Sequence, residues 1–426
     1  MVYDFVQHGH LILFGGSSAT GCLTGGFCGD TWEYNWTSGW VQVPTSVLCG
    51  NAATGACLAG KAPTPRDETG FAWDAGDGYA VLFGGRNSTT DMMTDTWKFV
   101  AGVWSLVIAS GGPEDRSGQA LTYDYSTGDG YLLMIGGTEG QYVPADWNWE
   151  FSAGAWSAVT PAASAGPGAT EGGSMVYDVA DGYVLYWGGF IPATGAYSSQ
   201  TWMFKSGVWT QLFPSNGPFA SEFASMAYDP AAGYVLLFGG EYFGFSYNWT
   251  WGYQAGSWFQ VCSYPCAFGI YPPAARYGSG MAYDQGSGAM ILFGGYGGRS
   301  GTSYLSDTWV FFATGTHVGY WTNYTTFLGS THPGSRALPG MAWDQADNEI
   351  VLFGGGNATS VFQDTWTMSY LYSGWTEVGV CGGPGQSSCA AGIPNRAAAM
   401  VFTYDAALRG VVMSGGDGSA AFYGYI

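Results

Sequence analysis

Few residues of this chain could do chemistry, and the cysteines are the most informative of them. The 426 residues include eight cysteines, which form four pairs close in sequence: Cys22 with Cys28, Cys49 with Cys57, Cys262 with Cys266, and Cys381 with Cys389. Such pairs form either disulfides or zinc sites. A zinc site needs CxxC-like knuckles or a nearby pair of histidines, and no CxxC occurs and no histidine stands beside a pair. We therefore predict four local disulfides, which persist in an oxidising compartment.

Asparagine sequons favour the same compartment. Five of the ten asparagines lie in Asn-x-Ser/Thr, where chance would give one or two, and they are Asn35, Asn87, Asn248, Asn323 and Asn357. Such positions accept N-linked glycans in secreted proteins. Together with the cysteine pairs they predict an extracellular or cell-surface location.

Residues suited to catalysis are scarce. The sequence holds only four histidines, His8, His10, His317 and His332, and no Gly-x-Ser-x-Gly, phosphate loop or HExxH. We predict no catalytic residue, no metal site and no cofactor.

Charge and composition exclude other classes. The net charge is −20, with 11 Lys and Arg against 31 Asp and Glu. Nucleic acids and anionic membranes are bound by clustered basic residues, so neither is a predicted partner, and the apolar runs are too short for this segment to insert into a bilayer. Glycine accounts for 71 residues and aromatic residues for 17%. Because disordered chains lack aromatics, the glycines must lie at turns between short aromatic-rich strands, which predicts an all-β protein.

An internal repeat organises these strands. A Gly-Gly pair follows an apolar run eight times, beginning at Gly15, Gly84, Gly136, Gly188, Gly239, Gly294, Gly354 and Gly415. An aromatic-Asp step precedes each pair, as in Tyr228-Asp229, and two tryptophans follow the first seven pairs, as in Trp251 and Trp258. Each unit therefore predicts four strands, a to d, of which strand b is apolar throughout and so covered on both faces. The predicted units 1 to 8 span approximately residues 1–65, 66–115, 116–170, 171–221, 222–275, 276–335, 336–395 and 396–426.

The eight diglycines and the paired aromatics resemble the kelch-repeat β-propeller family over essentially the whole chain. The motifs Tyr-Val-Leu-Leu-Phe-Gly-Gly at 234–240 and Asp-Thr-Trp at 307–309 are also similar to motifs of secreted archaeal cell-surface kelch proteins. The resemblance implies a single β-propeller domain of four-stranded antiparallel blades. Eight a–b halves favour eight blades, and seven blades are the alternative. Because Met1-Val-Tyr-Asp repeats the wording at 175–178, we expect the chain to begin inside a blade, with residues upstream of Met1 supplying the outer strand of the last one.

The family also includes copper-radical enzymes similar to galactose oxidase, which use two His and two Tyr as copper ligands and a Cys-Tyr crosslink. That crosslink would require a cysteine outside the four pairs, and sialidase-type boxes are absent. A secreted galactose oxidase-like or glycan-active enzyme is therefore the alternative to a non-catalytic function.

Recurring polar residues are predicted to be scaffold. We expect the aspartates that end strand a to accept turn N–H bonds, the arginines at 66, 116, 276 and 336 to link blades through carboxylates or carbonyls, and the paired tryptophans to pack between blades.

Function is then expected in residues that do not repeat. The resemblance implies that the b–c and d–a connections emerge on one face, which also holds all four predicted disulfides. Unshared aromatics in these connections form the candidate binding face: Tyr142, Phe190, Tyr197, Tyr242, Phe243, Phe245, Tyr247, Tyr296 and Tyr304. The predicted function is a non-catalytic binding or structural module whose partner is an extracellular protein, a glycan, or neighbouring subunits of a surface layer or filament.

Overall fold

The structure is a computed structural model in which the fold of most repeat units is described. It describes residues 2–4, 10–14, 29, 31–35, 39–43, 62–64, 66, 69–74, 76–86, 92–100, 103–108, 112–116, 119–124, 130–135, 138–139, 143–144, 148–159, 166–168, 170, 172–191, 194–206, 208–262, 271–297, 303–315, 317–328, 331–344, 348–362, 364–369, 374–378, 401–405 and 410–414. For some strand residues, including those of the last two strands, only the backbone is described. These residues form strands and one short 3₁₀ helix, η2 (Thr325–Phe327), with no α-helix among them, so the predicted all-β class is confirmed.

The main strands follow the predicted a-to-d order. The a strands are β1 (Val2–Asp4), β5 (Gly70–Asp74), β9 (Ala120–Asp124), β15 (Ser174–Asp178), β21 (Ser225–Asp229), β28 (Gly280–Asp284), β34 (Gly340–Asp344) and β40 (Val401–Asp405). The b strands are β2 (His10–Phe14), β6 (Tyr79–Phe83), β10 (Tyr131–Ile135), β16 (Tyr183–Trp187), β22 (Tyr234–Phe238), β29 (Ala289–Phe293), β35 (Glu349–Phe353) and β41 (Gly410–Ser414).

The c and d strands complete the units. The c strands are β3 (Thr31–Asn35), β7 (Thr96–Val100), β13 (Asn148–Ser152), β19 (Thr201–Lys205), β25 (Thr250–Gln254), β32 (Thr308–Gly315) and β38 (Thr365–Ser369). The d strands are β4 (Gly39–Gln42), β8 (Val103–Ile108), β14 (Ala155–Val159), β20 (Val208–Leu212), β26 (Ser257–Cys262), β33 (Val318–Asn323) and β39 (Gly374–Val378).

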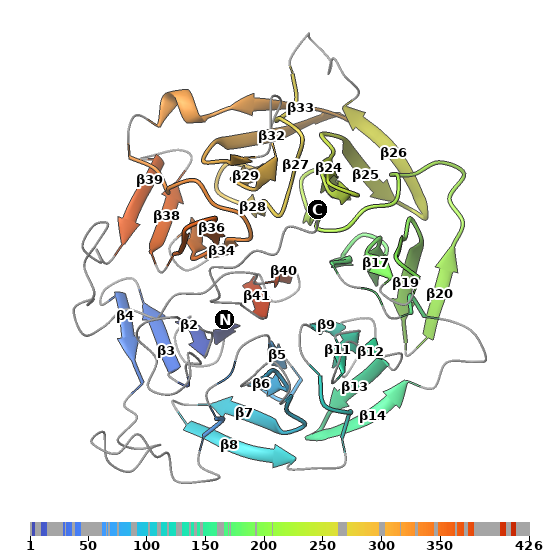
Figure 1. Cartoon of the computed structure of the whole chain (residues 1–426), viewed down its shortest axis with the longest axis vertical. Helices are drawn as coiled ribbons and strands as arrows, with labels where there is room; N and C mark the ends of the chain where they lie inside the picture. The colour runs from blue at the N-terminus through green and yellow to red at the C-terminus, as the bar shows by residue number, and fades with distance from the viewer. Residues whose placement is uncertain are drawn as a thin grey trace.

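These strands form antiparallel sheets arranged around a centre, a β-propeller-like architecture in which the d strands make the rim (Figure 1). In six sheets the order is a-b-c-d, and each pairing joins strands that are neighbours in this order. The sheet of unit 1 has six strands in the order β4-β3-β2-β1-β41-β40, because the hairpin β40–β41 adds to β1 with Val2 opposite Val412.

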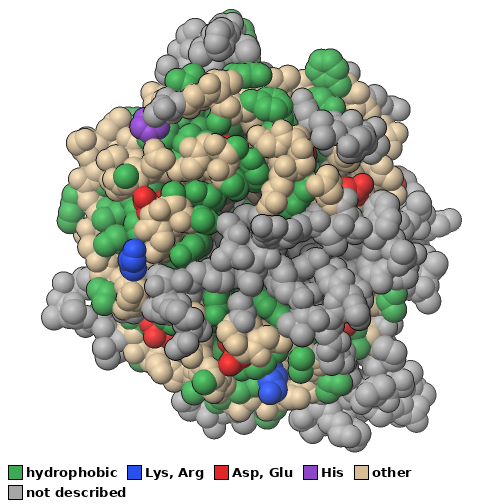
Figure 2. Space-filling model, turned by 180° about the vertical axis from the view of Figure 1, so that it is seen from behind, with side chains coloured by type: hydrophobic (Ala, Val, Ile, Leu, Met, Phe, Trp, Pro, Cys, Tyr) green, Lys and Arg blue, Asp and Glu red, His purple; other side chains and the backbone are tan. Residues whose placement is uncertain are grey.

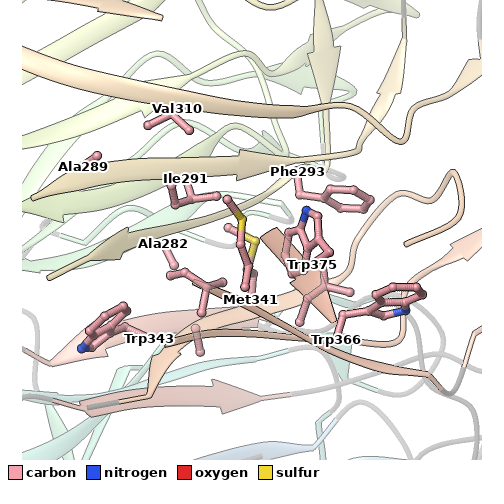
Figure 3. Close-up of a cluster of buried hydrophobic side chains, with 13 residues drawn as sticks. Ala282, Ala289, Ile291, Phe293, Val310, Met341, Trp343, Trp366 and Trp375 are labelled. Atoms are coloured by element: carbon pink, nitrogen blue, oxygen red, sulfur yellow. The ribbon is translucent and has the colours of Figure 1, made fainter. Parts of the chain in front are cut away.

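The hydrophobic core lies between neighbouring sheets. Every residue of β22 is buried, as its uninterrupted apolar sequence predicts for a strand covered on both faces. Figure 3 shows one such layer, in which Ile291, Phe293 and Val310 of unit 6 pack against Met341 and the tryptophans of unit 7.

The diglycines lie at the end of strand b, where one unit packs closely against the next. Gly239 and Gly240 have φ angles of 75° and 109°, which L side chains rarely adopt. A Cβ at Gly239 would lie 2.3 Å from the carbonyl oxygen of Arg276, the first residue of the next unit. The N–H of Gly240 donates to that same carbonyl at 3.0 Å. Only glycine allows the two units to approach this closely.

The aspartate that ends strand a caps the a–b turn, as predicted. The Oδ1 atom of Asp178 accepts the N–H groups of Ala180 and Asp181 at 3.1 and 3.2 Å. The equivalent aspartates at 74, 229 and 284 accept turn N–H groups in the same way. A carboxylate at this position is therefore part of the turn.

The repeated arginine is a buried clamp within its own unit. The guanidinium of Arg276 donates to both carboxylate oxygens of Asp307, at 2.5 and 2.7 Å, and to the carbonyl of Gly294 at 2.9 Å. Arg66 and Arg336 make the same contacts with their own Asp and Gly. The predicted carboxylate partner thus lies in the same unit for these three, while each Nε donates to the carbonyl two residues earlier, at the end of the preceding unit. The carbonyls of Arg276 and Arg336 in turn accept the N–H of a diglycine in the preceding unit.

In five units the second tryptophan of the pair makes the predicted link to the preceding unit. Nε1 of Trp258 donates to Oγ1 of Thr201, the first residue of strand c in the preceding unit, at 2.9 Å. Tryptophans 104, 156, 321 and 375 donate to the equivalent threonines. At Trp209 the preceding unit has Asn148 in place of Thr, and among the described residues Nε1 of Trp209 has no partner.

Candidate functional site

Short hairpins between strands b and c carry most of the predicted binding aromatics. In unit 4 this hairpin is β17 (Phe190–Ile191) with β18 (Ala196–Tyr197), in unit 5 β23 (Glu241–Tyr242) with β24 (Phe245–Ser246), and in unit 6 β30 (Tyr296–Gly297) with β31 (Ser303–Tyr304), which β27 (Arg276–Tyr277) extends. Units 3 and 7 have the equivalent hairpins β11 (Thr138–Glu139) with β12 (Val143–Pro144) and β36 (Gly356–Asn357) with β37 (Ser360–Val361). Several of these hairpins are labelled in Figure 1.

Three rings from units 4 and 5 form a compact group, which we call the aromatic corner: Tyr197, Tyr242 and Phe243. Their ring centroids lie 4.8 to 5.0 Å apart, and the rings of Tyr242 and Phe243 are nearly perpendicular, at 83°. Phe190 packs on Tyr197 from behind, 5.2 Å away. Phe243 stays 60% exposed and has a φ of 47°, so a strained turn holds its ring in solvent.

A second group, the tyrosine row, extends into unit 6 and comprises Tyr277, Tyr296 and Tyr304. The centroid of Tyr296 lies 5.5 Å from that of Tyr277 and 4.8 Å from that of Tyr304. Phe223 of unit 5 packs 6.2 Å from Tyr277. Aromatic side chains thus run across three consecutive units.

Two glutamates of unit 5 lie between the aromatic corner and the tyrosine row. Glu222 and Glu241 form an isolated antiparallel bridge, in which each N–H donates to the carbonyl of the other, at 3.0 and 2.9 Å. Residues paired in this way are directly opposite and project on the same side. Glu241 is only 8% exposed, and its carboxylate accepts the hydroxyl of Tyr197 at 3.2 Å and the N–H of Gly244.

Both carboxylates contribute to the raised pKa values of Tyr197 and Tyr277. Burial, followed by the charges of Glu241 and Glu222, raises the pKa of Tyr197 to about 12. Burial also raises the pKa of Tyr277, with further contributions from Glu241, Tyr296, Tyr304 and Glu222. The phenols are therefore neutral hydrogen-bonding groups at any physiological pH.

Most of this site belongs to units 4 and 5, which lack the Arg–Asp ion pair of units 2, 6 and 7. The position four residues before strand a is Arg in units 2, 3, 6 and 7, but Thr170 before β15 and Ser221 before β21. The Asp that precedes Thr-Trp is also missing in these two units, where Gln200 and Trp249 take its place, as Trp147 does in unit 3. Both members of the pair are thus replaced together in units 4 and 5.

Some of the aromatic residues predicted for the binding face contact one another. Phe190, Tyr197, Tyr242 and Phe243 come together, Tyr296 contacts Tyr304, and Tyr247 stacks on Trp249 at 3.8 Å. Phe245 is 71% exposed in the same hairpin as Tyr242, and Tyr142 lies outside the described residues.

Sequence reasoning missed Glu222, Glu241, Tyr277 and Phe223. A signal was present for the two glutamates, since both lie in unit 5, one of the two units in which Arg and Asp are both replaced. Their pairing across the bridge depends on the fold.

The remaining predicted sites are described only in part. The backbone of Cys262 is described, and the other seven cysteines lie outside the described residues, as do Asn87 and His8. Asn323 is exposed and Asn248 is half-buried, while Nδ2 of Asn357 donates to the carbonyl of Ser335 at 3.2 Å. Of Asn35 and His10 only the backbone is described.

The described histidines lie apart from the aromatic site. His317 stacks on Phe259 at 3.6 Å, and Nδ1 of His332 contacts the carbonyl of Pro333. In the part of the chain that the structure describes, no three His, Cys, Asp or Glu side chains gather to hold a metal ion. Over the same residues, no helix has the length and hydropathy needed to cross a membrane.

In comparisons with known proteins, no family model matches this chain, and no curated protein matches its sequence at a significant level.

Proposed function

We propose that the protein is an extracellular or cell-surface kelch-type β-propeller that recognises carbohydrate, without catalysis, through the aromatic face of units 4 to 6. The observation that carries this proposal is the aromatic corner with a buried carboxylate beneath it. The perpendicular rings of Tyr242 and Phe243 offer an apolar wall and floor to the C–H face of a sugar ring. Carboxylates and phenols beside them supply the few directed polar groups that fix orientation in a ligand site.

The propeller itself is part of the proposal. Eight a–b halves in the sequence favour eight blades, and the hairpin β40–β41 in the sheet of unit 1 supports the alternative of seven with the last half placed inside the ring. Direct counting of blades in an electron-microscopy reconstruction distinguishes the two arrangements.

The extracellular setting and the absence of catalysis rest on the sequence. Intact mass before and after reduction and deglycosylation measures the predicted disulfides and N-linked glycans. Fewer than three disulfides together with no glycan would remove the argument for secretion, and stoichiometric copper would favour the oxidase-like alternative.

Binding at the aromatic corner can be tested with matched variants. Tyr242→Ala combined with Phe243→Ala should reduce binding on a glycan array and in calorimetry by at least tenfold, because the wall and floor are both removed. Phe213→Ala is the control, since it removes another exposed ring, 83% exposed, just after the outer strand β20 of unit 4. Unchanged glycan binding by the corner variant, or no glycan bound by the wild type, would contradict the proposal.

Assembly with other subunits is the second candidate function. It is favoured by the exposed apolar side chains of Val208, Phe213 and Phe219 along the outer strand of unit 4 and the segment after it. Light scattering of the wild type and of Phe213→Ala tests it: loss of self-association with glycan binding intact would assign this surface to assembly.

A further inference from the structure

We infer that the protein binds an extended glycan chain, which lies along unit 5 from the aromatic corner outward. This inference rests on the proposed carbohydrate recognition and adds the class of ligand, a linear oligosaccharide of several pyranose units. It follows from a line of aromatic side chains that begins at the corner and that we call the aromatic strip: Tyr242, Phe245, Tyr247, Trp249 and Phe219.

The first three rings of the strip share one face of the hairpin β23–β24. Tyr242 pairs directly with Phe245, and the N–H of Tyr247 continues the ladder by donating to the carbonyl of Gly240 at 2.9 Å. Paired residues project on the same side and successive residues alternate, so these three side chains point to one side and Glu241 points to the other. Glu241 is buried, whereas Tyr242 and Phe245 are 38% and 71% exposed. The aromatic face of this hairpin is therefore the one that faces solvent.

Trp249 extends the strip because unit 5 lacks the charged clamp of the repeat. In unit 7 the guanidinium of Arg336 lies over the ring of Phe362, 4.0 Å from its centroid. Tyr247 is the equivalent of Phe362, since each lies two residues before the position that is Asp in units 2, 6 and 7. Trp249 holds that position in unit 5, and its ring stacks on Tyr247 with centroids 3.8 Å apart and an angle of 16°. An aromatic stack thus takes the place of the ion pair.

Phe219 ends the strip on the segment before β21. Its ring lies 4.9 Å from that of Trp249 and is 67% exposed, and Trp249 itself is half-buried. No member of the strip carries a charge, and charged side chains are also sparse among the coloured residues of the face seen in Figure 2. A ligand on the strip is therefore held by apolar contacts and by hydrogen bonds to neutral groups.

A line of rings suits a sugar chain better than a single sugar. The C–H face of one pyranose covers about one aromatic ring, so a single sugar at the corner leaves the rings beyond it in water. Further units of a linear chain cover those rings in turn, while the phenols of Tyr242 and Tyr247 donate to and accept from hydroxyl groups. Flat β-linked chains of the cellulose and chitin types match best, because every unit presents a C–H face. Affinity should therefore rise with chain length.

Calorimetry with dimers and hexamers of the cellulose and chitin series tests this. In at least one series the wild type should bind the hexamer about tenfold more tightly than the dimer, the gain expected from one or two further aromatic contacts. A longer chain also offers more positions to a short site, so a variant decides. Phe219→Ala should weaken hexamer binding several-fold and leave dimer binding unchanged, whereas Phe219→Tyr keeps the ring and should bind both as the wild type does.

Phe327→Ala is the matched control, because Phe327 is an equally exposed ring, 71% exposed, just after the outer strand β33 of unit 6. It should change neither affinity. Hexamer binding unaffected by Phe219→Ala, or no binding of either series when the array shows another glycan, would overturn the inference and leave carbohydrate recognition standing. So would a Phe219→Ala variant that loses only self-association. Absence of all glycan binding, or binding unaffected by Tyr242→Ala with Phe243→Ala, would overturn both.

Discussion

Replacement of Asp178 by Asn should reduce the dependence of stability on pH. Asp178 ends strand β15 and is fully buried. Burial is the largest cause that raises its pKa to about 7, the charge of Asp181 adds to it, and the turn N–H groups oppose it. The folded protein therefore keeps a proton that the unfolded chain loses near pH 4.

The sign and size of the effect follow from this difference. Because the folded state binds the extra proton between about pH 4 and pH 7, the free energy of unfolding falls as the pH rises through that window. A difference of about three pH units, at about 1.36 kcal/mol for each, corresponds to about 4 kcal/mol lost by pH 8. Asn carries no charge and keeps an oxygen for the N–H groups of Ala180 and Asp181.

We expect Asp178→Asn to match the wild type near pH 4 and to exceed it in stability by up to about 4 kcal/mol at pH 8. Urea unfolding followed by tryptophan fluorescence from pH 4 to 8 measures both values. A variant whose stability falls with pH as steeply as that of the wild type would refute the argument. A variant less stable than the wild type at pH 8 would do the same.

Three other predictions concern the scaffold. Trp258→Phe should cost about 1 kcal/mol more than Trp209→Phe in urea unfolding, because only Trp258 gives up an indole hydrogen bond; equal costs would show that the bond contributes nothing. Gly239→Ala should lower the free energy of unfolding by several kcal/mol, since the new Cβ would lie 2.3 Å from a carbonyl oxygen. Gly244 has a similar φ of 80° and open space around it, so Gly244→Ala should lower the free energy of unfolding by about 1 kcal/mol. Equal melting temperatures of these two variants would contradict the close approach of Gly239 to the carbonyl of Arg276. Arg276→Met should cost about 3 kcal/mol in denaturant unfolding, because the half-buried carboxylate of Asp307 loses its buried cation and keeps the indole N–H of Trp309; a loss below 1 kcal/mol would refute the clamp.

Much of the scaffold could be predicted because it depends on local sequence. Asp229 caps its turn through N–H groups two and three residues away, so the motif and its bond lie in one short segment. The buried strand at 234–238 is equally local, since five successive apolar residues have no polar face to expose.

The arginine partner was harder to predict. Arg276 lies 31 residues before Asp307, and the repeat alone led us to expect a partner that links it to another blade. The sequence predicted that a carboxylate or carbonyl would bind this arginine, and the packing of strand a against the b–c connection decided which one.

By itself, then, the sequence determined the strands, the turns and most of the aromatic residues of the hairpins, because hydrophobic periodicity and turn chemistry act over a few residues. The tertiary structure alone decided which of those aromatics meet. Tyr197 and Tyr242 come from different units, and Glu222 pairs with Glu241 only because the segment before β21 returns beside the hairpin that follows β22. The site depends on contacts between units. The repeat pattern of the sequence does not specify the orientation of each unit relative to the next.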